Sequence, residues 1–90
     1  MIMDGAYAND PVQCNSQMNR GDALKQLGQR VAKIRLDRGL TQEQLAERMG
    51  VSRNHIADIE LGTRNTGVWS ILLIARALDV RPGELLDHIR

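Results

Sequence analysis

The sequence predicts an all-α fold, a compact bundle of five short helices preceded by a flexible N-terminal tail. Apolar residues recur at steps of three and four from Leu24 onward, which is the period of an amphipathic helix. The segments with this period are separated by glycine-containing turns, and Ser, Thr or Asp stands where three of them would begin. A length of 90 residues with 42% apolar content fits one small globular domain.

The first twenty residues lack this period and are rich in Asn, Asp, Gln and Gly. We assign residues 1–20 to a mobile tail and residues 21–90 to the folded domain. The tail is either an extension without a role or an arm that packs on a partner subunit or lies along DNA. The single cysteine, Cys14, excludes an internal disulfide. Because no signal peptide or apolar run of membrane-spanning length is evident, we expect a cytoplasmic protein.

The first helix is expected from Asp22 or Ala23 to Arg38, with Asp22 as its N-cap and Gly39 as its stop. One apolar face runs along it and consists of Leu24, Leu27, Val31 and Ile34. Its other faces carry basic residues that we expect to be mostly solvated, namely Lys25, Arg30, Lys33 and Arg38.

The stretch TQEQLAERMGVSRNHIADIELG, residues 41–62, predicts two short helices joined by a tight turn. Thr41 and Gln44 have the spacing of a capping box at the start of the first. Gly50 ends that helix, because glycine readily adopts a positive φ. Ser52 caps the second helix, and the glycine that closes the stretch ends it.

The second of these helices, residues 53–61, turns a face with hydrogen-bonding and small apolar side chains away from the core. Arg can pair with the edge of guanine, Asn with the edge of adenine, and Ala can touch a thymine methyl group. Arg53, Asn54 and Ala57 are therefore candidate readers of bases in the major groove of DNA. Asp58 on the same face would either accept from a cytosine amino group or orient Asn54 through a local bond.

Together these motifs resemble the helix-turn-helix domain of the phage repressor and Cro family, also called Xre-like. The similar runs are LTQEQLA (40–46), GVS (50–52), IADIELG (56–62) and RN (64–65), within a resemblance that covers roughly residues 24–86. The resemblance implies a helix-turn-helix DNA-binding domain whose second motif helix enters the major groove. It also implies that the first helix of the domain crosses the DNA backbone, where some of its basic residues would meet phosphates.

The resemblance assigns roles to individual residues of this chain. Base reading carries over to Arg53, Asn54 and Asp58, and a structural ion pair to Arg35 and Glu60. Phosphate contacts are expected from Gln42, Ser52, His55, Arg64 and Asn65. For Gln42 the alternative is a helix former alone, and for His55 a contact at the flank of the helix. After Asn65 the family commonly has Pro, which this chain lacks, so we expect a more flexible loop.

A fourth helix is expected over residues 68–78, with Val68, Ile71, Leu72, Ala75 and Leu78 on its inward face. Trp69 and Leu73 occupy a neighbouring face where the family usually has polar residues. Either a second subunit covers them, or the tail or the last helix does. Pro82 suits the first turn of that last helix. The expected homodimer interface comprises Trp69, Leu73, Arg76, Leu86 and Ile89.

These features predict a sequence-specific DNA-binding transcriptional regulator that acts as a homodimer on a palindromic operator and there blocks or recruits RNA polymerase. Its size, and the phrase RN followed by SILLIARAL, resemble the small controller proteins of restriction-modification systems, beside prophage repressors and plasmid regulators. The alternative is a protein-interaction module such as an antitoxin with autoregulatory DNA binding. The net charge of only +1 does not by itself distinguish these functions.

An enzyme is not expected. The sequence has no glycine-rich phosphate loop, and its two histidines, His55 and His88, lack Cys or carboxylate companions at the spacing of metal ligands. We therefore expect no cofactor, no metal, no small-molecule ligand and no membrane partner.

Overall fold

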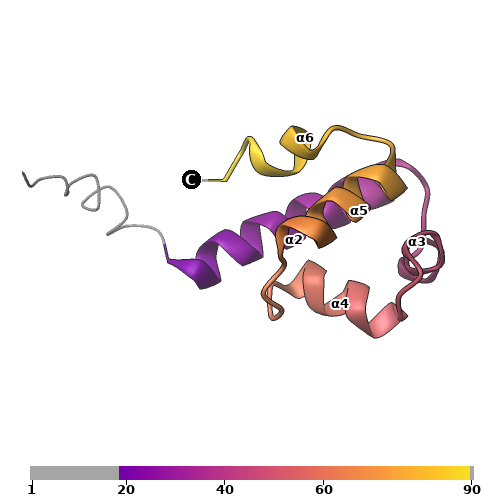
Figure 1. Cartoon of the computed structure of the whole chain (residues 1–90), viewed down its shortest axis with the longest axis horizontal. Helices are drawn as coiled ribbons and strands as arrows, with labels where there is room; N and C mark the ends of the chain where they lie inside the picture. The colour runs from indigo at the N-terminus through magenta and orange to yellow at the C-terminus, as the bar shows by residue number, and fades with distance from the viewer. Residues whose placement is uncertain (1–18, 90) are drawn as a thin grey trace, which may run out of the picture.

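Five helices follow one another along residues 19–89, which are the residues that the computed structural model describes (Figure 1). They are α2 (Arg20–Asp37), α3 (Gln42–Met49), α4 (Arg53–Leu61), α5 (Val68–Leu78) and α6 (Pro82–Leu86). The described part contains no strand, so the all-α prediction is confirmed. The predicted tail lies outside the described residues except at its end, where Asn19 and Arg20 begin α2; Cys14 lies outside them too.

Helix α2 begins earlier than predicted, because its N-cap is Asn19 and not Asp22. The Asn19 side-chain oxygen accepts a hydrogen bond of 2.9 Å from the backbone N–H of Asp22. Asn and Asp are equally good caps, and a cap at residue 19 adds several residues to the helix. Asp22 instead lies in the first turn, where its negative charge interacts favourably with the helix dipole.

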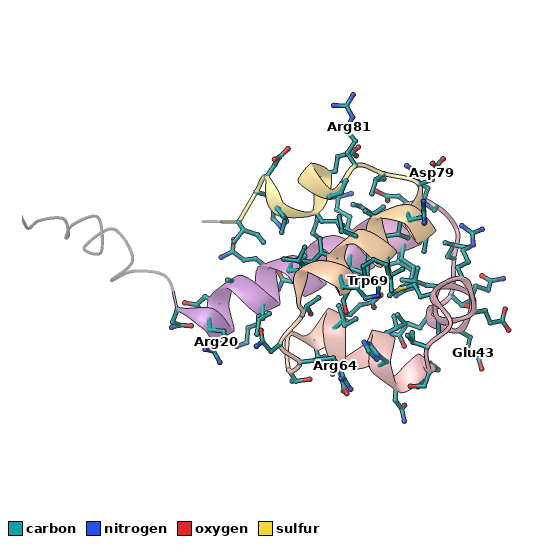
Figure 2. The ribbon with its side chains drawn as sticks, in the orientation of Figure 1. Arg20, Glu43, Arg64, Trp69, Asp79 and Arg81 are labelled. Atoms are coloured by element: carbon teal, nitrogen blue, oxygen red, sulfur yellow. The ribbon has the colours of Figure 1, made fainter. Side chains whose placement is uncertain are left out.

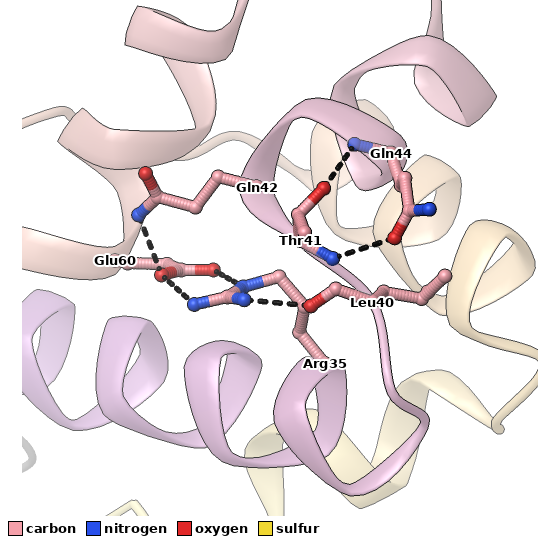
Figure 3. Close-up of polar contacts among 6 residues, drawn as sticks. All are labelled: Arg35, Leu40, Thr41, Gln42, Gln44 and Glu60. Atoms are coloured by element: carbon pink, nitrogen blue, oxygen red, sulfur yellow. Dashed lines mark hydrogen bonds and ion pairs between the residues drawn. The ribbon is translucent and has the colours of Figure 1, made fainter.

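The predicted ends of α3 and α4 are confirmed. Thr41 and Gln44 exchange two hydrogen bonds of 3.0 and 2.8 Å and so form the capping box (Figure 3). Gly50 and Gly62 end the two helices with φ angles of 72° and 77°, a conformation that glycine adopts without steric penalty. Ser52 caps α4 by accepting from the backbone N–H three residues later. These local signals fix both helices and the turn between them.

All five helices contribute side chains to one core. Its fully or nearly fully buried members are Leu27, Val31, Ile34, Leu45, Ala46, Ile56, Ile59, Ile74, Ala75, Leu78 and Leu85. Helices α2 and α4 approach each other closely at Gly28. A Cβ atom on Gly28 would overlap the backbone carbonyl groups of Ile59 and Glu60. The small size of this residue therefore sets how closely the two helices can pack.

The inward face of α5 differs from the prediction. Val68 and Leu72 are 73% and 43% exposed, whereas Ile74 is fully buried. The core stripe is Ile71, Ile74, Ala75 and Leu78. At about 100° per residue, Val68 and Leu72 lie roughly 70° and 110° away from the centre of that stripe, on the flank of the helix. Both therefore add to the apolar surface of α5.

Arg30 and Arg48 bind the C-terminal part of the chain, and one of them, Arg30, was expected in solvent. Arg30 donates to the carbonyl of Glu84 at 3.0 Å, and Arg48 donates to the carbonyl of Ala77 at 3.0 Å. The last carbonyl groups of a helix have no partner within the helix, which makes them available to such donors. The short helix α6 is thus fastened to α2, and α3 to the end of α5.

We expect Gly28→Ala to lower the free energy of unfolding by about 2 kcal/mol, because the new methyl group must push α4 away from α2. Urea unfolding followed by circular dichroism measures this change. Gly21→Ala is the matched control in the same helix, since its Cβ would meet only the exposed cap oxygen of Asn19 at 3.3 Å. The control should stay within about 1 kcal/mol of the wild type, and equal stability of the two variants would contradict the packing argument.

Candidate nucleic-acid interface

Helices α3 and α4 form the helix-turn-helix unit, with a turn at residues 50–52 between them (Figure 1). Two buried residues of α4, Ile56 and Ile59, hold it on the core. Its first residues project away from the bundle, and both Arg53 and Asn54 are exposed. The unit therefore presents the N-terminal half of α4 to solvent while its other face is fixed.

A buried carboxylate, that of Glu60, joins the three helices around this unit (Figure 3). Arg35 of α2 donates to its two oxygens at 2.7 and 3.1 Å. Gln42 of α3 donates to it at 2.9 Å. The side chains of Arg35 and Glu60 are only 11% and 7% exposed, and a third bond of 2.8 Å runs from Arg35 to the carbonyl of Leu40. The predicted ion pair is confirmed, and it belongs to a larger network.

The side-chain nitrogen of Gln42 therefore has a structural partner that the sequence prediction did not give it. An amide nitrogen carries two hydrogens, and the bond to Glu60 uses one. The second remains available for a phosphate oxygen. Gln42 is also the first residue of α3, where unpaired backbone N–H groups suit an anion. The phosphate contact of Gln42 stays a prediction, now combined with a structural role.

The four predicted base readers lie along one side of α4, which we call the reading face: Arg53, Asn54, Ala57 and Asp58. Arg53 and Asn54 are exposed, whereas Ala57 and Asp58 are half-buried. The structure therefore brings all four onto an accessible surface of one helix. Ser52 and His55 flank its start, and Ser52 accepts from the backbone N–H of His55 at 3.1 Å. Base and phosphate contacts of these residues stay predictions.

Asp58 has a partner that the sequence prediction did not identify. Its carboxylate lies 3.6 Å from the guanidinium group of Arg64, in the loop after α4. A local bond to Asn54 was one of the two roles considered for Asp58, and in residues 19–89 its carboxylate pairs with Arg64 instead. The backbone carbonyl of Asp58 also accepts from the N–H and the hydroxyl group of Thr63 at 3.1 and 3.3 Å. The reading face and the following loop are thus connected at one residue.

A second exposed feature lies on α5, on the side of the molecule that carries Trp69 (Figure 2). Trp69 is 71% exposed and borders an open hollow of about 480 Å³. The hollow is lined by Trp69, Leu72, Leu73, Ala75, Arg76, Asp79, Val80 and Pro82. Of the other predicted interface residues, Leu86 is 41% exposed, whereas Ile89 packs partly against the core. Trp69 is thus exposed as predicted, whereas Leu73 is half-buried and Ile89 contributes to the core; the interface itself stays a prediction.

Residues 19–89 lack two further kinds of feature, a metal site and a membrane-spanning helix. No group of three or more His, Cys, Asp or Glu side chains in this part could hold a metal ion. None of its helices has the length and apolar character needed to cross a membrane.

Comparison with known proteins gives a family match over residues 31–85, to the helix-turn-helix model. Among curated proteins, the chain is 46% identical over 61 residues to the control protein C.BamHI of Bacillus amyloliquefaciens, covering 67% of this chain and 75% of that protein.

Two solved structures share this arrangement of helices. The restriction-modification controller protein C.AhdI of Aeromonas hydrophila is 42% identical, with a TM-score of 0.67, covering 69% of this chain and 94% of that one. The controller protein C.Esp1396I, solved as a tetramer in complex with its natural 35 base-pair operator, is 34% identical with a TM-score of 0.67. That match covers 72% of this chain and 86% of that one.

We expect Glu60→Ala to lower the free energy of unfolding by about 3 kcal/mol, because it leaves the buried guanidinium group of Arg35 without its carboxylate. Thermal or urea unfolding measures the change. Asp37→Ala is the control, since it removes the Lys33–Asp37 pair, whose side chains are both 62% exposed. Exposed pairs contribute less than about 1 kcal/mol, so equal losses for the two variants would contradict a special role for the buried network.

Proposed function

The chain belongs to the helix-turn-helix family, and from this premise we propose that it is a DNA-binding transcriptional regulator whose helix α4 reads bases in the major groove. The single observation that carries the proposal is the reading face of α4, held outward by the buried Glu60 network. The major groove of B-DNA, about 12 Å wide, admits one α-helix. An accessible face with Arg and Asn at its N-terminal end has the chemistry to distinguish base pairs there.

Phosphate contacts would position this helix on the duplex. Gln42 offers its free amide hydrogen at the start of α3, and Ser52 and His55 stand at the start of α4. Arg64 and Asn65 are both exposed in the loop after α4. In the sequence these groups come before and after the reading face. They could therefore contact the phosphates of the two strands that border the groove. Their contribution would be strongly dependent on salt.

We further propose that two copies of the chain associate through the apolar surface of α5. Trp69, Leu72 and the hollow beside them give a large exposed apolar area for so small a domain. The hollow also carries one residue of each charge, Arg76 and Asp79. In a two-fold symmetric interface, Arg76 of each copy can face Asp79 of the other. Such a dimer would present two α4 helices about 34 Å apart to a palindromic operator.

Within the family, we propose that the protein is a regulator of the controller type, because it is similar to controller proteins. The solved controller protein C.AhdI is covered over 94% of its length by this chain. The comparisons favour the regulator over the antitoxin alternative. We infer that the protein acts by binding and not by catalysis. It would work in the cytoplasm, the compartment that holds the DNA. Its effect on transcription would come from changing the access of RNA polymerase to the promoter.

Selection of bound duplexes from a random DNA pool tests the proposed function. The wild type should enrich a two-fold symmetric site, and the Arg53→Ala/Asn54→Ala variant should lose that enrichment. The single change Arg53→Ala should cost about 1–3 kcal/mol on the selected site and relax the choice at one base position. Arg81→Ala is the control: it removes the same charge as Arg53→Ala, but Arg81 lies on the far side of the molecule from α4 (Figure 2).

Failure of the wild type to enrich any sequence, with salt-sensitive binding alone, would contradict sequence-specific regulation. Equal weakening of Arg53→Ala on every sequence would instead make Arg53 a phosphate ligand.

The proposed dimer predicts that Trp69→Glu is monomeric, because a carboxylate would have to be buried without a partner in the interface. Sedimentation velocity at micromolar concentration measures the oligomeric state. Leu36→Glu is the control, since Leu36 is also exposed but lies on α2. A Trp69→Glu protein that sediments as the wild type does would move the interface away from this surface.

A further inference from the structure

The ion pair between Asp58 and Arg64 has the properties of a contact that can be exchanged. It is a single contact of 3.6 Å, and both side chains remain nearly half exposed. The pair between Arg35 and Glu60 is different, since it is short, uses two nitrogens and is almost completely buried. Exposed single pairs contribute little and are weakened by salt, whereas buried ones must stay paired. Arg64 can therefore leave Asp58 at small cost.

The main chain holds this loop whether or not the ion pair is present. Thr63 donates to the backbone carbonyl of Asp58 through both its N–H and its hydroxyl group. Thr66 in turn donates to the carbonyl of Arg64 at 3.4 Å. None of these three bonds involves the carboxylate of Asp58. A change of that side chain therefore alters the charge beside Arg64 without releasing the loop that carries it.

Asp58 is also the one acidic residue of the reading face. It stands four residues after Asn54, on the same side of α4. A carboxylate near the phosphates of DNA repels them, and it competes with them for a guanidinium group. Arg64, by the proposed function, is itself a phosphate ligand. The two carboxylate oxygens and the phosphate oxygens are thus alternative acceptors for the same donors.

Resting on the proposed function, we propose that Asp58 is a specificity-determining residue that lowers affinity for DNA of arbitrary sequence by holding Arg64. On DNA of arbitrary sequence Asp58 keeps Arg64 paired, whereas on the operator Arg64 exchanges the carboxylate for a phosphate group. The freed carboxylate then faces the groove, where the amino groups of cytosine and adenine are the base-edge donors available to it. A site that offers such a donor compensates for the loss of the ion pair, and a site that lacks one does not.

The test is equilibrium binding of the full chain to a fluorescent random-sequence duplex and to the selected operator, each across a range of salt concentrations. Asp58→Asn should bind the random duplex about three- to tenfold more tightly. On the random duplex, the plot of its log K against log salt concentration should have a steeper slope, by the amount that about one more phosphate contact gives. Affinity for the operator should change less, so the ratio of specific to non-specific binding falls. The melting temperature should be unchanged, because the pair is weak.

Two controls separate the exchange from simple repulsion. In the Arg64→Ala background, Asp58→Asn should no longer steepen the salt dependence, because the arginine that it frees is gone. Asp87→Asn removes an equal charge at the C-cap of α6 and should change binding less than twofold, because α6 lies on the opposite side of the bundle from α4 (Figure 1).

Two results would overturn the inference while leaving the proposed function intact. One is an Asp58→Asn protein that binds random DNA no more tightly than the wild type does. The other is a steeper salt dependence that persists without Arg64. A wild type that binds no duplex even at low salt would overturn the proposed function, and this inference with it.

Discussion

The carboxylate of Glu60 is the group on which the geometry of the DNA-binding unit depends. It accepts hydrogen bonds from α2 through Arg35 and from α3 through Gln42, while it belongs to α4. A buried carboxylate without partners would be strongly destabilising, so the three helices must pack where both donors can reach it. Arg35 also binds the carbonyl of Leu40, which fixes the connection between α2 and α3. One side chain thus sets the orientation of the helix that is proposed to read DNA.

This network requires α2 and α4 to lie close together, and Gly28 permits it. The carbonyl groups of Ile59 and Glu60 occupy the space that a Cβ atom would need. Where the backbones approach this closely, the short bond of 2.7 Å from Arg35 to Glu60 becomes possible. The buried network of Glu60 therefore lies between α4 and the rest of the bundle, whereas the weaker ion pair of Asp58 lies on the exposed side of α4. This division keeps the helix position fixed while the outer side chains remain free to change partners.

The sequence allowed the fold to be predicted, because local signals fix most helix ends, and of the site it gave the ion pair of Arg35 and Glu60. Thr41, Gln44, Gly50 and Gly62 placed α3 and α4 correctly. The start of α2 was wrong, because two good capping residues stand three positions apart and either could act. The prediction of the inward face of α5 was partly wrong, because the spacing of apolar residues does not separate the centre of a helix face from its flanks. The Asp58–Arg64 pair was not predicted, since it depends on the path of the loop between two helices.

The exposed apolar surface of α5 explains why reading DNA and forming a dimer would be linked in so small a protein. Residues 19–89 place eleven apolar residues in the buried core, and a domain of this size has a thin margin of stability. Burying Trp69 in a second copy would add apolar contact that the single chain cannot supply. The same association doubles the number of reading helices and fixes their spacing, so a symmetric site is bound through both at once. Each copy alone would have one short helix and a small net charge of +1 with which to hold DNA. Specific binding would therefore depend on protein concentration as well as on sequence, because the dimer must form before or during binding.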